Sequence, residues 1–199
     1  MSDIALARDT LPAGSVSYRS AGWWAMMYAI ASEAALFGYL LFSYYYFAIQ
    51  PHVAKWPPEP MGFKLSVPNT IILLLSSVAV WWAERGLRKD VRWQQAAGLL
   101  VGIVLGVVFV AIQVLEWKGR SFSISSHPYG SLYFTITGFH MAHVIVGLLI
   151  LLALLVWVLF GYFGPQRDAP MSLGAIYWHF VDVVWLTVFF TFYITPHLG

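Results

Sequence analysis

The sequence predicts an all-α membrane protein, a bundle of five transmembrane helices. Of its 199 residues, 60% are hydrophobic and only 10% are charged, whereas about a quarter of the residues in a soluble domain are charged. A soluble chain of about 200 residues could not bury so much apolar surface. The apolar residues also gather in five stretches that are long enough to cross a bilayer as helices. They do not form the alternating stretches of about ten residues that are typical of barrel strands.

Composition excludes several other classes of protein. Cysteine is absent, so the chain has no disulfide, no thiolate metal site and no haem attached through a Cys-x-x-Cys-His motif. The net charge of +2 gives no electrostatic basis for binding nucleic acid. Residues 1–20 are mixed polar, so we expect a polar N-terminal segment without a cleaved signal peptide. We predict a single transmembrane domain over residues 21–199.

The first three predicted spans are separated by short, turn-forming connections. The first runs from about Gly22 to Phe47, and Glu33 is its only charged residue. The second covers about Val67 to Ala83, and Pro68 near its start suits the first turn of a helix. The third covers about Ala96 to Leu115.

The last two spans complete the predicted bundle. The fourth runs from about Leu132 to Phe160 and is long enough to tilt in the bilayer. The fifth runs from about Leu173 to Thr195 and contains His179 and Asp182. Prolines and glycines mark the connections, and no linker is long enough to separate two domains.

The distribution of Lys and Arg predicts the orientation of the bundle. With the N-terminus inside, the cytoplasmic segments hold seven of these residues and the outside loops hold four. Four of the seven lie in the connection between the second and third spans, at Arg85, Arg88, Lys89 and Arg92. Because cytoplasmic loops are enriched in Lys and Arg, we expect the N-terminus inside and the C-terminus outside.

Five ionisable residues lie inside the predicted spans: Glu33, His140, His143, His179 and Asp182. An ionisable group inside a membrane costs at least a few kcal/mol and is a functional hypothesis by default. Histidine is a common ligand of iron and copper, so the three histidines could hold a haem or a metal. However, a rise of 1.5 Å per residue and a core of about 30 Å place the fourth-span and fifth-span histidines about 9 Å apart in depth. We therefore predict no metal ligand and no catalytic residue in this chain.

A structural role is the alternative for the histidines and the aspartate. His179 and Asp182 are spaced i, i+3 on one helix, so they could pair directly or bond across to another helix. His140 and His143 have the same spacing and could donate to backbone carbonyls or to nearby threonine hydroxyl groups. We expect these four residues to hold helices together.

Glu33 is harder to explain as a structural residue. It lies near the middle of the first span among apolar neighbours, and no basic residue is near it in the sequence. Such surroundings favour the neutral form of a carboxyl group. Three roles stay open at this point: a member of a proton relay, a contact to a lipid headgroup, or a protonated donor to a facing helix.

Two long motifs resemble a known family. Residues Thr137–Gly147, which read TGFHMAHVIVG, and Tyr177–Trp185, which read YWHFVDVVW, are similar to signatures of subunit III of haem-copper terminal oxidases. Shorter matches occur in the same order along the chain, at Ser32-Glu33, Leu36-Phe37, Trp56-Pro57-Pro58, Pro68-Asn69-Thr70, Ser76-Ser77, Gln113 and Glu116-Trp117. The chain is identified by these motifs as a member of that family from about Ala21 onward.

The resemblance implies an accessory role in a proton-translocating cytochrome c oxidase. In this family, subunit III carries no haem or copper, which lie in partner subunits. It packs directly beside subunit I, within a complex that includes subunit II and smaller subunits, and supports proton uptake. The chain would therefore belong to an enzyme without being catalytic itself.

The resemblance also bears on individual residues and on lipid. Glu33 matches the family's carbodiimide-reactive carboxylate in the membrane, and His140, His143, His179 and Asp182 match structural residues. The longer family form has seven helices and binds phospholipid between the first two and the other five. This chain starts at the equivalent of the third helix, so lipid binding near Glu33 would need a wall from another subunit.

The short form is typical of bacterial oxidases, and we expect a multi-pass protein of the bacterial cytoplasmic membrane in contact with membrane lipids. Two alternatives share the fold: subunit III of a quinol oxidase, and a paralogue associated with nitric oxide reductase. An alternative of another class is a stand-alone membrane enzyme that binds haem or a metal.

Overall fold

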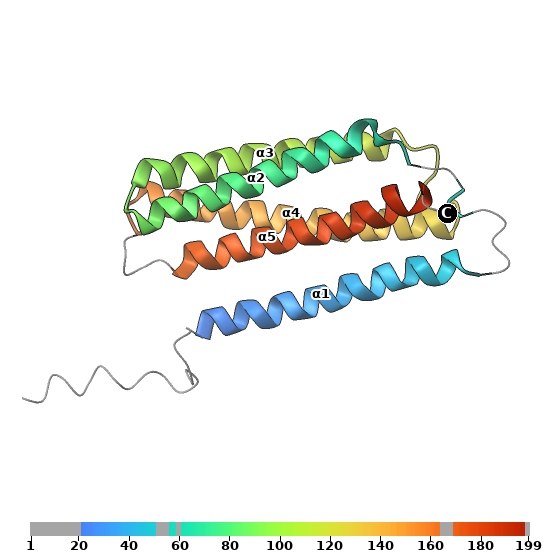
Figure 1. Cartoon of the computed structure of the whole chain (residues 1–199), viewed down its shortest axis with the longest axis horizontal. Coiled ribbons are helices and arrows are strands. Elements are labelled where there is room, and N and C mark those ends of the chain that lie inside the picture. Colours follow the sequence, from blue (N-terminus) through green and yellow to red (C-terminus); the bar gives the residue numbers. More distant parts are fainter. Residues whose placement is uncertain (1–20, 51–55, 59–60, 164–168, 198–199) are drawn as a thin grey trace, which may run out of the picture.

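Five long helices make up the computed structural model, which describes residues 21–50, 56–58, 61–163 and 169–197 (Figure 1). All five are long and apolar enough to cross a membrane. The all-helical class and the five spans are therefore confirmed, and the predicted polar segment over residues 1–20 lies outside the described residues. The helices are α1 (Ala21–Ala48), α2 (Phe63–Arg88), α3 (Arg92–Lys118), α4 (Pro128–Leu159) and α5 (Ala169–Phe189), which continues through a π-helical segment (Phe190–Ile194) and a 3-10 turn (Thr195–His197).

The last four helices each begin four residues before the apolar stretch that predicted them. Hydropathy detects only the part of a helix that suits hydrocarbon, whereas the first turns include residues such as Lys64 and Arg92 that suit the interface. The start of α4 shows the local chemistry. Pro128 occupies the first turn, and the His127 Nδ1 atom accepts a hydrogen bond of 2.9 Å from the Gly130 N–H. Proline lacks the N–H that a first turn leaves unpaired, so this sequence starts a helix well.

Helices α2 to α5 form one group, and α1 lies along the side of that group formed by α4 and α5 (Figure 1). The α2 and α3 helices run antiparallel and pack closely along their length (Figure 1). A Cβ atom on Gly98 would lie 2.7 Å from the Ala79 carbonyl oxygen and 2.8 Å from the Ala83 Cβ. Small residues thus let the two backbones approach, as is common between membrane helices.

Two tryptophans of α5 fill the centre of the group. The indole of Trp178 lies against Gly106 of α3 and Gly147 of α4, where Cβ atoms would approach it to 2.9 Å and 2.7 Å. Its Nε1 atom donates to the Ser76 Oγ of α2 at 3.1 Å. The Nε1 atom of Trp185 donates to a second α2 hydroxyl, Thr70 Oγ1, at 2.9 Å. Both buried indole N–H groups are therefore satisfied, and both tie α5 to α2.

The α1 helix is held by fewer contacts than the others. Among its residues only Phe37 and Tyr44 are buried. The Tyr44 ring packs on Phe192 with ring centroids 4.9 Å apart, and the Tyr45 hydroxyl lies 3.2 Å from Thr191 Oγ1. A polar contact at mid-helix, between Glu33 and His143 of α4, adds a third attachment.

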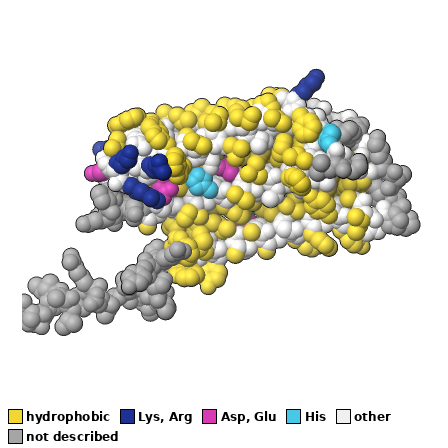
Figure 2. Space-filling view, in the orientation of Figure 1, with side chains coloured by type: hydrophobic (Ala, Val, Ile, Leu, Met, Phe, Trp, Pro, Cys, Tyr) yellow, Lys and Arg dark blue, Asp and Glu magenta, His cyan; other side chains and the backbone are white. Residues whose placement is uncertain are grey.

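Hydrophobic side chains cover most of the face seen in Figure 2. Lys and Arg side chains gather at one end of that face, beside Asp and Glu side chains. The turn between α2 and α3 supplies exposed basic residues there, including Arg88 and Lys89. This distribution suits a bundle whose sides face lipid and whose ends face water.

Candidate functional site

The five ionisable residues predicted from sequence do not form one site. Glu33 and His143 meet between α1 and α4. His140 is enclosed in the core. His179 and Asp182 lie on α5 near Ser77 of α2. Within the part of the chain that the structure describes, no group of three His, Cys, Asp or Glu side chains is arranged to hold a metal ion.

Glu33 and His143 form a hydrogen bond between two helices. The Glu33 Oε2 atom lies 3.0 Å from His143 Nε2, and His143 Nδ1 lies 2.7 Å from the Phe139 carbonyl oxygen. A carbonyl oxygen only accepts, so Nδ1 carries a hydrogen and donates it. In a neutral imidazole Nε2 is then an acceptor, and the Glu33 carboxyl group must be the donor. In a protonated imidazole Nε2 donates to the carboxylate. In both states one proton lies on the bond that joins Glu33 to His143.

The pair of Glu33 and His143 lies between α1 and α4, where both side chains are partly exposed. The Glu33 side chain is 37% exposed and that of His143 is 15% exposed. The Phe37 ring packs against the imidazole with ring centroids 5.1 Å apart, and the Tyr177 hydroxyl donates to the His143 carbonyl oxygen at 3.4 Å. The Glu33 side chain is thus partly exposed at the surface of the chain, while the imidazole of His143 is held by Phe37 and by the Phe139 carbonyl.

The partner of Glu33 could not be found by local inspection of the sequence. Its neighbours along the chain include no basic residue, and the basic group comes from a residue 110 positions later. The expected bond from His143 to a backbone carbonyl is confirmed at Phe139. The i to i+4 geometry of a helix explains that bond, because the Phe139 carbonyl lies one turn before His143.

The hydrogen bond that was expected of His140, to a backbone carbonyl or a threonine hydroxyl group, is not found among the described residues. Its side chain is 1% exposed, and neither ring nitrogen has a hydrogen-bond partner among the described residues. The imidazole instead packs on Trp185 and Phe109, with ring centroids 5.0 Å and 5.9 Å away. The nearby Thr137 hydroxyl donates to the Tyr133 carbonyl oxygen at 2.6 Å. His140 therefore occupies an aromatic position of the core.

Of the two alternatives left open for His179 and Asp182, the direct pair is not found among the described residues. His179 Nδ1 lies 2.5 Å from Ser77 Oγ of α2, so the alternative of a bond across to another helix is confirmed. Asp182 is 4% exposed, and no described residue completes a hydrogen bond to either carboxylate oxygen. The Ser77 hydroxyl lies beside this carboxylate as well. Ser77 on the facing helix α2 thus takes the place of the direct pair between His179 and Asp182 that their spacing on α5 suggested.

Sequence reasoning missed an acidic and basic cluster at the end of α3. The Glu116 Oε1 atom accepts a hydrogen bond of 2.6 Å from the Tyr193 hydroxyl and forms an ion pair with Arg120. The Glu116 side chain is 4% exposed. Burial acts to lower the pKa of Arg120, but Tyr133, Tyr193 and Glu116 act in the other direction, and the net shift of the pKa is upward. The spacing of Glu116 and Arg120, one helical turn, is the signal that could have revealed this pair.

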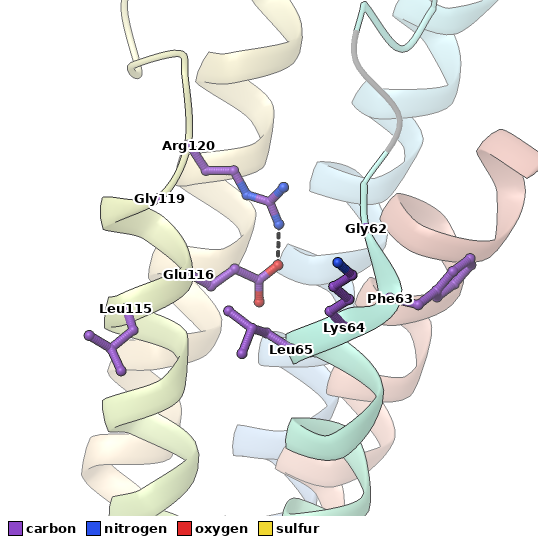
Figure 3. Close-up of a pocket in the computed structure, with 8 residues that line it drawn as sticks. All are labelled: Gly62, Phe63, Lys64, Leu65, Leu115, Glu116, Gly119 and Arg120. Atoms are coloured by element: carbon purple, nitrogen blue, oxygen red, sulfur yellow. Dashed lines mark hydrogen bonds and ion pairs between the residues drawn. The ribbon is translucent and has the colours of Figure 1, made fainter.

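A pocket of about 380 Å³ opens beside this cluster, between the start of α2 and the end of α3 (Figure 3). Charged and apolar side chains both line it. In Figure 3, Glu116 of α3 and Lys64 of α2 point toward each other across the gap. The lining residues are Gly62, Phe63, Lys64, Leu65, Leu115, Glu116, Gly119 and Arg120.

Comparisons with known proteins agree on one family. The family model described as cytochrome c oxidase subunit III matches residues 14–196. Cytochrome c oxidase subunit 3 of Drosophila melanogaster is 36% identical over 179 residues, which cover 85% of this chain and 68% of that protein. The protein of the same name from Papio hamadryas is 38% identical over 172 residues, or 82% of this chain and 66% of that protein. The one from Neurospora crassa is 37% identical over 172 residues, or 82% of this chain and 64% of that protein.

Proposed function

The chain belongs to the cytochrome c oxidase subunit III family, and we propose that it supports proton uptake by the oxidase through the couple of Glu33 and His143. Subunit III is an accessory subunit of the terminal oxidase and has no catalytic centre of its own. The chain is accordingly a multi-pass membrane protein of a respiratory oxidase. Haem and copper then belong to partner subunits, and we propose that subunit I is a direct neighbour.

One observation carries the role of the couple. The bond of 3.0 Å between Glu33 Oε2 and His143 Nε2 holds one proton, and the Glu33 side chain remains 37% exposed. A carboxyl and an imidazole that share a proton can release it to, or accept it from, a neighbouring group with little rearrangement. Ionisable residues within membrane spans commonly form such relays. A neighbouring subunit at the open side of α1 would be in reach of this proton.

The test replaces Glu33 within the assembled oxidase. In Glu33→Gln the amide N–H can still donate to His143 Nε2, so α1 stays attached, but the side chain no longer exchanges a proton. We expect the initial rate of oxygen consumption at equal haem content to stay within about twofold of wild type, because no bond to a redox centre is lost. Proton uptake should be slowed or inactivation during turnover accelerated. A matched control is Glu84→Gln, which changes a carboxylate at the end of α2 that bonds Ser172 Oγ at 3.1 Å.

Two outcomes contradict the proposal. If Glu33→Gln matches the Glu84→Gln control in proton uptake and in lifetime under turnover, the couple has no part in proton supply. If the initial rate instead falls about a hundredfold, equivalent to about 2.7 kcal/mol of barrier, Glu33 is catalytic.

We also propose cytochrome c rather than quinol as the electron donor of the complex. The matched family and the relatives above carry the name cytochrome c oxidase, which favours this donor over a quinol oxidase or a complex with nitric oxide reductase. Oxidation of reduced cytochrome c by the purified complex, compared with oxidation of quinol, distinguishes these.

For the location we propose the bacterial cytoplasmic membrane, with the N-terminus inside. Basic residues at the turn between α2 and α3, including Arg88 and Lys89, support this orientation. A reporter fused within that turn should be cytoplasmic. A periplasmic signal at the turn, together with a cytoplasmic C-terminus, would reverse the assignment.

A further inference from the structure

We propose that the pocket between α2 and α3 binds a phospholipid headgroup that carries a hydrogen-bond donor beside its phosphate, as phosphatidylethanolamine and phosphatidylglycerol do. Lys64 and Arg120 would hold the phosphate, and Glu116 would accept from the ammonium or hydroxyl group. The proposal depends on the chain spanning a membrane and not on the role of Glu33.

The position of the pocket is that of a headgroup. It lies where α2 begins, at Phe63, and where α3 ends, at Lys118 (Figure 3). Both helices are candidate membrane spans, so their paired ends lie at the level where hydrocarbon gives way to polar headgroups. The pocket is also separate from the couple of Glu33 and His143, because α1 lies on the opposite side of the bundle from α2 and α3 (Figure 1).

The cationic side of the pocket suits a phosphate. Lys64 is exposed in the first turn of α2, and no described carboxylate lies within ion-pair distance of it. Arg120 gives one N–H to Glu116, and a guanidinium has five N–H donors. The N-cap of α2, Gly62, provides no side-chain cap, so backbone N–H groups of the first turn add positive potential. Two cations and a helix N-terminus therefore face one carboxylate.

That carboxylate decides which headgroup fits. Glu116 Oε1 already accepts from Tyr193 and Arg120, whereas Oε2 is buried and has no partner among the described residues. Glu116 also lines the pocket. Oε2 is covered by protein in this arrangement, so a headgroup donor reaches it after a rotation of the Glu116 carboxylate; a buried carboxylate oxygen without a donor is costly, which favours that rotation when the ligand brings one. An ethanolamine or glycerol headgroup brings a donor. A choline headgroup has no N–H or O–H to offer.

The apolar lining suits the start of the acyl chains. Phe63, Leu65 and Leu115 line the pocket beside the charged groups and are exposed on the bundle surface. A volume of about 380 Å³ accommodates a headgroup, and the chains would continue along the apolar sides of α2 and α3 into the bilayer. The charged residues of the pocket thus lie where the headgroup would be, and the apolar residues lie where the acyl chains would begin.

The experiment measures lipid on the assembled oxidase. The complex with the full chain is placed in bilayer discs that contain photoreactive phosphatidylethanolamine, and cross-linked peptides of this chain are quantified by mass spectrometry. We expect cross-links to peptides from the start of α2 and the end of α3. Lys64→Gln should lower this yield about tenfold, because a charge-assisted bond to phosphate is lost. Lys118→Gln is the matched control, since Lys118 lies at the same end of α3 but does not line the pocket.

Competition separates the possible ligands. Unlabelled phosphatidylethanolamine and phosphatidylglycerol should displace the probe, and phosphatidylcholine should need a concentration about tenfold higher. Glu116→Gln should reduce that preference. If this variant does not assemble, Lys64→Gln still tests the site.

Four results would overturn the proposal: equal losses in Lys64→Gln and Lys118→Gln, no loss in either, displacement by inorganic phosphate alone, or cross-linking of the pocket to a protein subunit instead of lipid. Equal competition by phosphatidylcholine would overturn the part assigned to Glu116.

Discussion

Glu33 of α1 and His143 of α4 are joined by a hydrogen bond of 3.0 Å, and the Phe139 carbonyl fixes which nitrogen of the imidazole faces the carboxyl group. The bond from His143 Nδ1 to the Phe139 carbonyl determines which group can donate in the bond between His143 Nε2 and Glu33. Because Nδ1 is committed as a donor, the bond to Glu33 contains one proton in either charge state of the pair. The hydrogen bond that attaches α1 to α4 therefore depends on the proton that the pair shares, and loss of that proton from the pair would weaken the attachment of α1.

The first prediction concerns reaction with an apolar carbodiimide, which attacks a protonated carboxyl group. Glu33 shares a proton and is 37% exposed, whereas Asp182 and Glu116 are each 4% exposed. The reagent should therefore label Glu33 in preference to the two buried carboxyl groups. Peptide mapping by mass spectrometry measures the labelled fraction at each residue, and Glu33→Gln should remove the main label. Equal labelling of Asp182 would contradict the burial of its side chain.

The second prediction contrasts the two neighbouring histidines of α4. His140 has no described hydrogen-bond partner and packs among aromatic rings, so His140→Phe should be neutral or stabilising because no bond is broken. His143→Phe removes the bond to Glu33 and should cost about 1–3 kcal/mol, because a polar group of α1 is left unpaired. Thermal denaturation in mild detergent, followed by retention of the subunit in the complex, measures both.

The reverse result, in which His140→Phe is much the more damaging, would mean that the polar ring of His140 is needed at this core position and that aromatic packing alone does not explain it. Unchanged haem spectra in both variants are expected, since neither residue belongs to a redox centre.

Sequence predicted the helices well because their signal is local. Each span is a continuous apolar stretch. The first turns of four helices and the last turns of α2 and α3, which end at Arg88 and Lys118, were missed, since polar and interfacial residues extend a helix beyond the hydrocarbon. The buried polar contacts were harder. The i, i+3 spacing suggested that His179 would pair with Asp182, but Ser77 lies 102 positions away in sequence and takes the bond.

The same limit explains the other differences at the site. The partner of Glu33 depends on how α1 packs against α4, and no pattern within α1 contains that information. His140 looked like a hydrogen-bonding residue because its type is polar, yet its neighbours in space are Phe109 and Trp185. The family resemblance located all these residues without specifying their contacts.

The third prediction tests the bond between α2 and α5. Ser77→Ala and His179→Ala each remove one side of the contact of 2.5 Å. Each should cost about 1–3 kcal/mol and weaken retention of the subunit without changing haem spectra. Because both variants remove the same bond, the double variant should be less destabilised than the sum of the two, by about 0.5–3 kcal/mol. Denaturation midpoints of the four proteins give this coupling.

Strict additivity of the two changes would show that Ser77 and His179 do not interact. Asp182→Asn provides a related check. It keeps the shape of the side chain beside Ser77, so retention of the subunit should be affected less than in Asp182→Ala.

The last prediction uses two glycines of one helix that differ in their surroundings. At Gly147 of α4 an added Cβ would lie 2.7 Å and 2.9 Å from Cε3 and Cζ3 of Trp178, and at Gly138 it would meet nothing within 4 Å. Trp178 is fully buried and donates to Ser76, so its ring cannot move without breaking a bond to α2. Gly147→Ala should therefore destabilise the bundle by about 1–3 kcal/mol. Gly138→Ala should be neutral in the chain alone, or stabilising by about 0.5–1 kcal/mol, because alanine restricts the unfolded chain more than glycine does.

Melting temperature and the near-ultraviolet signal of tryptophan measure both variants, Gly147→Ala and Gly138→Ala, in detergent. If Gly138→Ala preserves the isolated chain but lowers its retention in the oxidase, a partner helix packs on that face of α4; if Gly147→Ala is as stable as wild type, the close packing of Trp178 against α4 is wrong.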